Sequence, residues 1–167
     1  MMAIQSLRTG DCVDEVIDKY SNMVYRLALA QMRNKQDAED VFQDVFLRYI
    51  SQPRTFESEE HRKAWLIRIT INRSRSIWAG WFRKRKPFND LFVAETNTES
   101  DLSEYLSLLP QKYRSVIHLF YYEELSVKQI SEILSTKEST VRTWLTRARS
   151  ILRKKLEGGP LNGQECL

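Results

Sequence analysis

The sequence predicts an all-α protein of two small helical domains joined by a flexible linker. Apolar residues recur at three- and four-residue steps through most of the chain, which is typical of helices that bury one face. One stretch, 87–103, departs from this pattern because it is polar and poorly periodic, as linkers are. The chain of 167 residues is long enough for two small domains. We therefore expect domains at 1–86 and 104–157, followed by a frayed tail at 158–167.

Two helices are expected at the start of the first domain. The first has an apolar face at helical spacing, formed by Val13, Val16, Ile17, Tyr20, Met23, Val24 and Leu27. The second begins after Asn34, a suitable N-cap with Asp37 three residues later, and runs to about Ile50. It ends there because the residue before Pro53 avoids helical geometry.

The third expected helix, from Ser58 to about Phe82, lies in the most basic stretch of the chain. Residues 61–89 contain nine Lys or Arg, no Asp or Glu, and three of the four tryptophans, Trp65, Trp78 and Trp81. Basic side chains attract phosphates, and aromatic faces stack on unpaired bases. The stretch therefore indicates contact with single-stranded nucleic acid. A soluble helix with a charged face and buried tryptophans explains it equally well.

Charge is segregated along the whole sequence. The net charge is −4 over residues 1–60, +9 over 61–89, −5 over 90–136 and +4 over 137–167. A general nucleic-acid coat would be basic throughout, so this segregation favours separate surfaces for separate partners.

Several classes of protein are disfavoured. Cys12 and Cys166 match no metal-ligand spacing, so we expect no metal or other cofactor. His61 and His118 lie on separate segments without a nucleophile beside them, and there is no glycine-rich phosphate loop, so no enzyme activity is expected. The sequence shows no apolar run of membrane-span length and no signal-peptide core, which predicts a cytoplasmic protein.

The second domain predicts a helix-turn-helix preceded by another helix. Pro110 suits the first turn of a helix over about 111–123. Ser126 and Gln129 form the sequence signature of a capping box, which opens a short helix over 127–134. A turn is expected at 135–137, before a longer helix whose inward stripe comprises Val141, Leu145, Ala148 and Leu152.

The outer face of that longer helix is rich in hydrogen-bond donors. It carries Arg142, Thr143, Thr146 and Arg149, with Arg147 at its edge. A short helix, a tight turn and such a face suit insertion into the major groove of DNA, where arginine pairs with guanine edges. The alternative is an ordinary helical hairpin with a solvated basic face.

The helix over 37–49 has an unusual acidic face. Asp40, Gln43, Asp44 and Leu47 share this side, opposite the apolar side of Ala38, Phe42, Val45 and Tyr49. An apolar residue within an acidic face suits a basic helical partner. A surface leucine on a solvated face is the simpler alternative.

Four segments together resemble bacterial sigma factors of the extracytoplasmic-function (ECF) group, in the sigma-70 family. They are residues 37–47 (DAEDVFQDVFL), 62–69 (RKAWLIRI), 109–114 (LPQKYR) and 140–149 (TVRTWLTRAR). Their order and spacing match the family over roughly residues 12–156. The resemblance implies a sigma-2-like helical bundle and a sigma-4-like helix-turn-helix. It also implies a transcription initiation factor without catalytic activity, which directs core RNA polymerase to specific promoters.

The resemblance assigns each candidate surface to a partner. The acidic face would bind the coiled coil of the β′ clamp of polymerase through Asp40, Gln43, Asp44 and Leu47. At the −10 element, Phe56 and Asn72 would line a pocket for a flipped base, and the non-template strand would be held by Trp65, Arg68, Arg73 and Arg75. The −35 element would be read by Arg142, Thr143, Thr146, Arg147 and Arg149. The β flap of polymerase and an anti-sigma factor, often membrane-bound in the family, are further implied partners.

Three residues depart from the family pattern in the helix-turn-helix. Trp144 stands where a basic residue is common, Ser135 where a glycine is usual, and Lys137 where a capping Ser or Thr is usual. Ser135 together with Glu138 offers a replacement cap. The alternative function is a stand-alone helix-turn-helix regulator, whose first ninety residues would supply a ligand pocket or a dimer seam instead.

Overall fold

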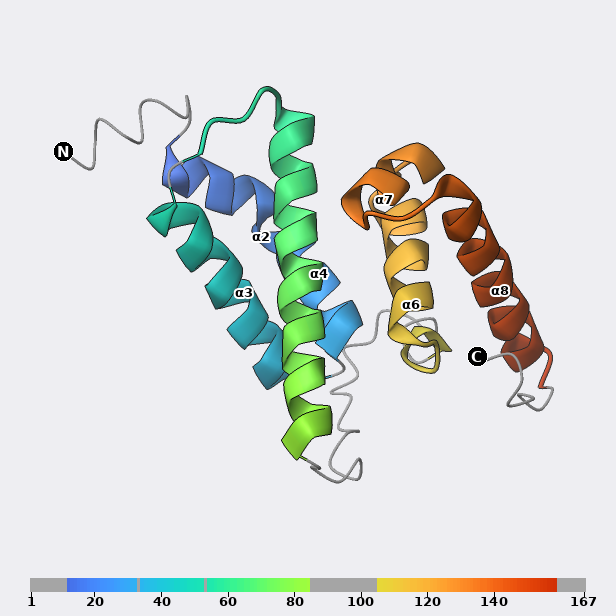
Figure 1. Cartoon of the computed structure of the whole chain (residues 1–167). Coiled ribbons are helices and arrows are strands. Elements are labelled where there is room, and N and C mark those ends of the chain that lie inside the picture. The colour runs from blue at the N-terminus through green and yellow to red at the C-terminus, as the bar shows by residue number, and fades with distance from the viewer. Residues whose placement is uncertain (1–11, 33, 53, 85–104, 159–167) are drawn as a thin grey trace. The chain divides into compact units, whose positions relative to one another are not determined.

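The computed structural model describes residues 12–32, 34–52, 54–84 and 105–158, and its described elements are all helices (Figure 1). The chain divides into two compact units between Val93 and Ala94. The all-α prediction is confirmed. The expected linker, 87–103, and the expected tail beyond Gly158 lie outside the described residues.

The first unit is built from α2 (Val13–Met32), α3 (Lys35–Ser51) and α4 (Glu59–Lys84). α2 packs against both α3 and α4, which also contact each other (Figure 1). Each helix contributes apolar residues to one core, including the fully buried Val24, Leu27, Ala28, Val41, Val45 and Leu66. The indole of Trp78 donates from Nε1 to the backbone oxygen of Gln31 at 2.9 Å, which ties the second half of α4 to the end of α2.

The expected helix boundaries of this unit agree closely with the structure. The Asn34 side chain caps α3 by accepting from the backbone N–H of Asp37 at 2.8 Å. α4 begins one residue after Ser58 and continues without interruption past the expected end at Phe82. At the start of α4, the Glu59 carboxylate accepts hydrogen bonds from Tyr20 Oη at 2.5 Å and Lys19 Nζ at 3.3 Å, and it pairs with Arg62. This network ties α2 to the first turn of α4.

The second unit contains α6 (Gln111–Ile117), a π-helical turn η2 (His118–Tyr122), α7 (Val127–Ile133) and α8 (Glu138–Leu156). Its core includes Leu109, Tyr113, Val116, Leu119, Ile130 and Val141, each with no exposed side-chain surface. The capping box at the start of α7 is confirmed, with both reciprocal hydrogen bonds between Ser126 and Gln129 present.

The structure corrects three expectations in the second unit. Pro110 is the N-cap of α6 and not a residue of its first turn. The single helix expected over 111–123 changes to π geometry at its end, where the N–H of Glu123 donates to the His118 oxygen five residues earlier. On α8 the buried stripe ends at Ile151, and Leu152 is only partly buried. The inserted π residue has no signature in apolar spacing, so the sequence did not reveal it.

The contacts of Glu59 predict how stability depends on pH. The hydrogen bond from Tyr20, assisted by Lys19 and Arg62, lowers the pKa of Glu59 below its ordinary value of 4.5, although partial burial opposes this effect. A carboxyl whose pKa is lower when folded contributes stability above its unfolded pKa, and this contribution is lost as pH falls through the folded pKa. We therefore expect Glu59→Gln to remove part of the acid destabilisation below about pH 4.5.

Urea unfolding of the full chain between pH 3 and pH 7 measures this effect. Glu59→Gln should be less stable than wild type at neutral pH, and the difference should shrink on acidification. Glu60→Gln, an exposed neighbour in the same helical turn, is the matched control. Parallel pH profiles for wild type and Glu59→Gln would contradict the prediction.

Candidate functional site

The expected acidic face lies on the exposed side of α3. Asp40 and Gln43 are exposed, and Leu47 has 61% of its surface exposed. Such exposure is uncommon for a leucine in the middle of a helix, and it leaves an apolar contact point available to a partner. The structure therefore brings these three residues to one accessible surface.

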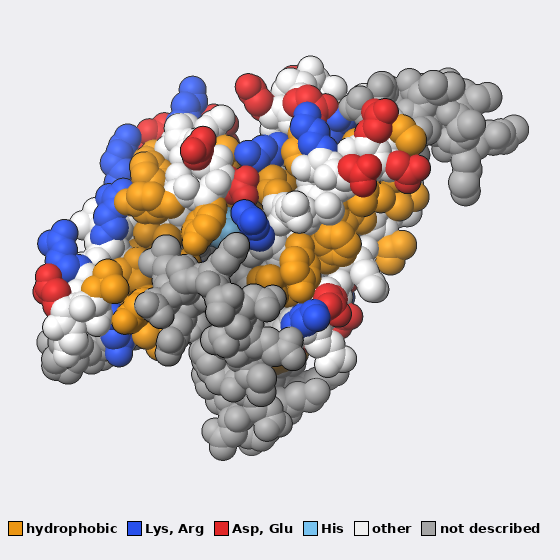
Figure 2. Space-filling model, turned by 180° about the vertical axis from the view of Figure 1, so that it is seen from behind, with side chains coloured by type: hydrophobic (Ala, Val, Ile, Leu, Met, Phe, Trp, Pro, Cys, Tyr) orange, Lys and Arg blue, Asp and Glu red, His pale blue; other side chains and the backbone are white. Residues whose placement is uncertain are grey.

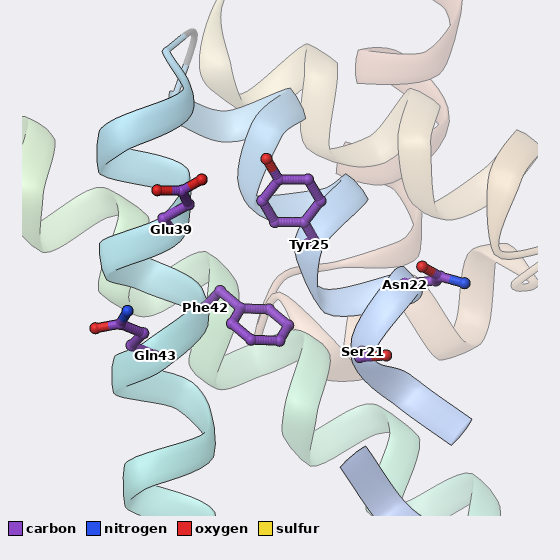
Figure 3. Close-up of a pocket in the computed structure, with 6 residues that line it drawn as sticks. All are labelled: Ser21, Asn22, Tyr25, Glu39, Phe42 and Gln43. Atoms are coloured by element: carbon purple, nitrogen blue, oxygen red, sulfur yellow. The ribbon is translucent and has the colours of Figure 1, made fainter. Parts of the chain in front are cut away.

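A hollow of about 380 Å³ adjoins this face, between α2 and α3 (Figure 3). Ser21, Asn22 and Tyr25 of α2 and Glu39, Phe42 and Gln43 of α3 line it. The rings of Tyr25 and Phe42 meet edge to face, with centroids 6.1 Å apart (Figure 3). No sequence pattern pointed to Tyr25, and Phe42, expected on the apolar side of this helix, is only partly buried.

Asp44 differs from the rest of the acidic face because it pairs with Arg73 of α4. The two side chains are 35% and 33% exposed. Asp44 was expected to meet polymerase and Arg73 to meet DNA, yet each neutralises the other in this structure. The ion pair thus joins two residues that the sequence analysis assigned to different partners.

The loop before α4 holds Phe56 in an aromatic cluster. Its ring stacks on Tyr49 at 6.2 Å with an interplanar angle of 6°, and it meets the edges of His61 at 5.6 Å and Trp65 at 5.9 Å. The Arg62 guanidinium lies over the Phe56 ring at 5.4 Å. Phe56 is therefore positioned by α3 and α4 and does not extend freely into solvent. Tyr49, expected on the apolar side of α3, and Arg62 both contact the Phe56 ring, a role that apolar spacing did not reveal.

Two of the three tryptophans on α4 have no freely exposed ring face. Trp65 and Trp78 are each only 7% exposed, because Trp65 packs against Tyr49 and Phe56 and Trp78 packs against the end of α2. Trp81, half-buried, tilts against Trp78 with ring centroids 5.4 Å apart. The alternative of a helix with buried tryptophans therefore describes Trp65 and Trp78.

Three exposed polar residues of α4 form a stripe beside Trp65. At about 100° per residue, Arg68, Asn72 and Arg75 lie within about 80° of Trp65 on one side, and all three are exposed. Asn72 is about 10 Å further along the helix axis than Trp65. Arg73 lies on the other side, where it meets α3. The structure thus groups two of the expected strand-binding residues, Arg68 and Arg75, with Asn72 of the expected base pocket, and it separates Arg73 from them.

The turn before α8 is strained and lacks the expected cap. Ser135 has φ of +53°, the left-handed conformation for which a glycine is usual. Lys137 is the N-cap, without a side-chain hydrogen bond to the helix. The expected cap by Ser135 and Glu138 is wrong, because Glu138 instead pairs with Arg142 at 3.0 Å on the helix surface.

The expected reading residues of α8 are all exposed. Figure 2 shows Lys and Arg side chains along the outer edge of the unit that contains α8. The hydroxyls of Thr143 and Thr146 donate to backbone oxygens one turn earlier, each at 2.9 Å, which fixes their side chains and leaves their oxygens able to accept. Arg149 differs, because its Nε donates to Tyr121 Oη at 2.7 Å. Trp144 is half-buried, and Lys112 Nζ lies 5.9 Å from the centroid of its ring. Trp144 therefore contacts the rest of the unit and does not extend into solvent.

The described part of the structure contains neither a candidate metal site nor a candidate membrane-spanning helix. Among residues 12–32, 34–52, 54–84 and 105–158, no group of three His, Cys, Asp or Glu side chains could hold a metal ion. No described helix is both long and apolar enough to cross a membrane.

The Asp44–Arg73 ion pair predicts energetic coupling between α3 and α4. Asp44→Asn and Arg73→Gln should each destabilise the first unit, and the double variant should lose less than the sum of the two. For a pair one-third exposed, we expect a coupling of about 0.5–1 kcal/mol from urea unfolding of the four proteins. Arg75→Gln combined with Asp44→Asn is the matched control and should be additive. If the destabilisations by Asp44→Asn and Arg73→Gln are also additive in the double variant, the coupling is excluded.

The left-handed Ser135 predicts a stabilising substitution. Glycine avoids a steric cost of about 1–2 kcal/mol at such a position, while its greater unfolded-state entropy removes about 0.5–1 kcal/mol of the gain. Ser135→Gly should therefore stabilise the second unit by about 0.5–1 kcal/mol in thermal unfolding. Ser135→Ala, which keeps the Cβ, should give no gain, and equal behaviour of the two variants would refute the strain.

Family profiles match both units of the chain. The profile described as Sigma-70 region 2 matches residues 16–88, which cover most of α2 and all of α3 and α4. The profile described as Sigma-70, region 4 matches residues 100–152, which cover α6, α7 and most of α8.

Curated proteins and solved structures agree with these profiles. The chain is 29% identical over 180 residues to the ECF RNA polymerase sigma factor SigW of Bacillus subtilis (strain 168), with 92% of this chain and 94% of the relative covered. It is 28% identical over 156 residues to the ECF sigma factor SigM of the same organism, with 84% and 93% covered. The fold is similar to that of the sigma factor RpoE from Bartonella quintana, solved in complex with the anti-sigma factor NepR, at a TM-score of 0.73 and 21% identity, with 86% of this chain and 96% of that chain covered. The chain belongs to the sigma-70 family, in its ECF group.

Proposed function

We propose that the protein is a transcription initiation factor that binds core RNA polymerase and directs it to specific promoters. The observation that carries this proposal is the succession of region 2 and region 4 in one chain. A stand-alone helix-turn-helix regulator would need only the second. The proposed role requires no catalytic activity of the chain itself and places it in the cytoplasm with polymerase.

Polymerase binding is proposed for the exposed side of α3. Asp40, Gln43 and Leu47 combine negative charge, a hydrogen-bonding amide and an exposed apolar contact, which suits the coiled coil of the β′ clamp. The hollow floored by Tyr25 and Phe42 extends this surface toward α2. Asp44 contributes only if it leaves Arg73, so we assign it a smaller share of the binding energy. The β flap is the proposed second contact of polymerase.

Recognition of the −10 element is proposed for the Phe56 loop and the stripe on α4. Phe56 and Asn72 would flank a flipped base, and Arg68 and Arg75 would follow the phosphates of the non-template strand. Trp65 packs against Phe56 and, being only 7% exposed, offers little surface to DNA. Arg73 joins the DNA surface only when its pair with Asp44 opens.

Recognition of the −35 element is proposed for the outer face of α8. This proposal is supported by the exposure of Arg142, Thr143, Thr146 and Arg147 on one face of α8, since recognition helices insert such a face into the major groove. Because Arg142 pairs with Glu138 in this structure, this ion pair must open before Arg142 binds a base edge. The threonine side chains are already fixed by their backbone hydrogen bonds.

Energetics support a polymerase partner. Separating DNA strands costs about 1.4 kcal/mol per base-pair step, so opening about ten pairs costs more than about 10 kcal/mol. Stacking returns about 1–3 kcal/mol for each captured base. Because Trp65 and Trp78 are buried, this chain has even fewer aromatic faces for capture than its composition suggests. Polymerase must therefore supply much of the energy that holds the strands apart.

An anti-sigma factor is the proposed regulator. Solved relatives with this fold include a sigma factor in complex with NepR and CnrH in complex with the cytosolic domain of CnrY, the latter at a TM-score of 0.67, 18% identity, and 95% of this chain and 98% of that chain covered. A regulator of this protein would cover the exposed α3 face and so exclude polymerase. A membrane anchor on that regulator would link the protein to signals from outside the cell.

Charge reversal on α3 tests the proposed polymerase contact. Wild type should co-elute with core RNA polymerase and give transcripts with defined 5′ ends. Asp40→Lys should reduce affinity for core polymerase by at least about tenfold. The substitution replaces a negative charge with a positive one, which would repel a basic partner. Asp40 is exposed and has no described role in packing, so the helix content measured by circular dichroism should be unchanged.

The matched control is Glu157→Lys, which reverses an exposed charge at the end of α8 and should leave association unchanged. Retention of wild-type affinity by Asp40→Lys would show that the α3 face is wrongly assigned. Failure of wild type to associate with core polymerase at all would overturn the proposed function.

A further inference from the structure

The side chain of Arg149 is held by two aromatic residues of η2. Its Nε donates to Tyr121 Oη at 2.7 Å, and its guanidinium carbon lies 5.5 Å from the ring centroids of both Phe120 and Tyr121. The two rings meet at 77° with centroids 5.0 Å apart. A guanidinium fixed in this way loses less conformational entropy on binding than a free arginine side chain does.

The π-helical turn explains why these aromatic residues are at the surface. The extra residue in η2 lets Leu119 and His118 remain buried while Tyr121 and Tyr122 are 53% and 46% exposed. His118 stacks on Tyr122 at 5.0 Å, which anchors the turn from inside. π-helical turns of this kind are frequent at functional sites. The exposed Tyr121, which contacts Arg149 of α8, therefore suggests a role beyond packing.

Arg149 lies at the flank of the reading face and not at its centre. At about 100° per residue, it is about 90° from the middle of the face formed by Arg142, Thr143, Thr146 and Arg147. The centre of a recognition helix meets base edges, whereas its flanks and the preceding helix approach the sugar-phosphate backbone. Both Arg149 and η2 are therefore placed for phosphate contact.

The hydrogen bond between the two side chains leaves suitable donors for an anion. Tyr121 accepts through Oη, so its own O–H proton remains able to donate. In the described part of the chain, no further hydrogen bond or ion pair of Arg149 accompanies the one to Tyr121. The Tyr121 hydroxyl and the guanidinium of Arg149 are therefore neighbouring donors, a combination that suits a phosphate oxygen.

We propose that Tyr121 and Arg149 form a phosphate-binding clamp that fixes the register of α8 on promoter DNA without reading sequence. The clamp rests on the proposed function and adds Tyr121, with Arg149 reassigned from base reading to phosphate contact. It acts on one strand beside the −35 element, and it contributes equally to all −35 sequences.

The test uses full-length protein with core RNA polymerase and two promoter duplexes. Their sequences are taken from the DNA upstream of the 5′ ends of transcripts made with wild type. One duplex carries the intact −35 element, and the other carries a scrambled −35 element of equal length. Tyr121→Phe keeps the ring against Arg149 and removes only the hydroxyl. It should weaken binding to both duplexes by the same factor, about two- to tenfold for the loss of one hydrogen bond.

Arg149→Gln should also weaken binding to both duplexes by the same factor. It should make the slope of log affinity against log salt concentration less steep by about one. Tyr122→Phe is the matched control, since it removes a hydroxyl from the neighbouring exposed ring, and it should bind as wild type does. A loss confined to the intact −35 duplex would overturn the clamp in favour of base reading.

The result for wild type separates the two proposals. If wild-type holoenzyme prefers the intact −35 duplex and Tyr121→Phe binds both duplexes as wild type does, the clamp alone is overturned. If wild-type holoenzyme shows no such preference, the proposed function is overturned and the clamp with it.

Discussion

The burial of one side of α4 against α2 and α3 is the constraint on which the first unit depends. Leu66, Ile67 and Ile71 have almost no exposed surface, and the Trp78 indole is bonded to the end of α2. With that side fixed, Arg68, Asn72 and Arg75 are directed away from the core. The same packing holds Phe56 against Trp65, so the loop that precedes α4 is ordered by the helix core. Burial and the proposed capture of DNA are thus two consequences of one helix orientation.

The surface of the first unit contains charges that are neutralised by each other. Asp44 and Arg73 form an ion pair between the helix proposed to meet polymerase and the helix proposed to meet DNA. Exposed ion pairs of this kind are weak, so a partner with a better charge match can displace them at little cost. A polymerase residue that engages Asp44 would release Arg73 toward the non-template strand. Such an exchange would favour DNA capture in the complex over capture by the free chain.

Two departures from regular backbone geometry shape the proposed DNA-binding side of the second unit. The π-helical turn η2 places Tyr121 beside Arg149, and the left-handed Ser135 closes the turn between α7 and α8. Both departures lie next to the proposed DNA surface. Strained or irregular backbone is tolerated where the surrounding core fixes it, and here that core is formed by Leu119, Ile130 and Val141.

The sequence by itself determined the division into two units, the family and the described helices apart from the π-helical turn, because apolar periodicity, capping residues and motif order are local properties of the chain. The Asn34 cap and the Ser126–Gln129 capping box are examples. The exposure of Asp40 and Leu47 also follows from helical spacing alone. Only the tertiary structure decided which aromatic faces remain accessible, since burial of Trp65 and Trp78 depends on segments distant in the sequence. It also decided that Asp44 meets Arg73 and that Arg149 meets Tyr121, because each pair joins two helices whose relative rotation no local pattern specifies.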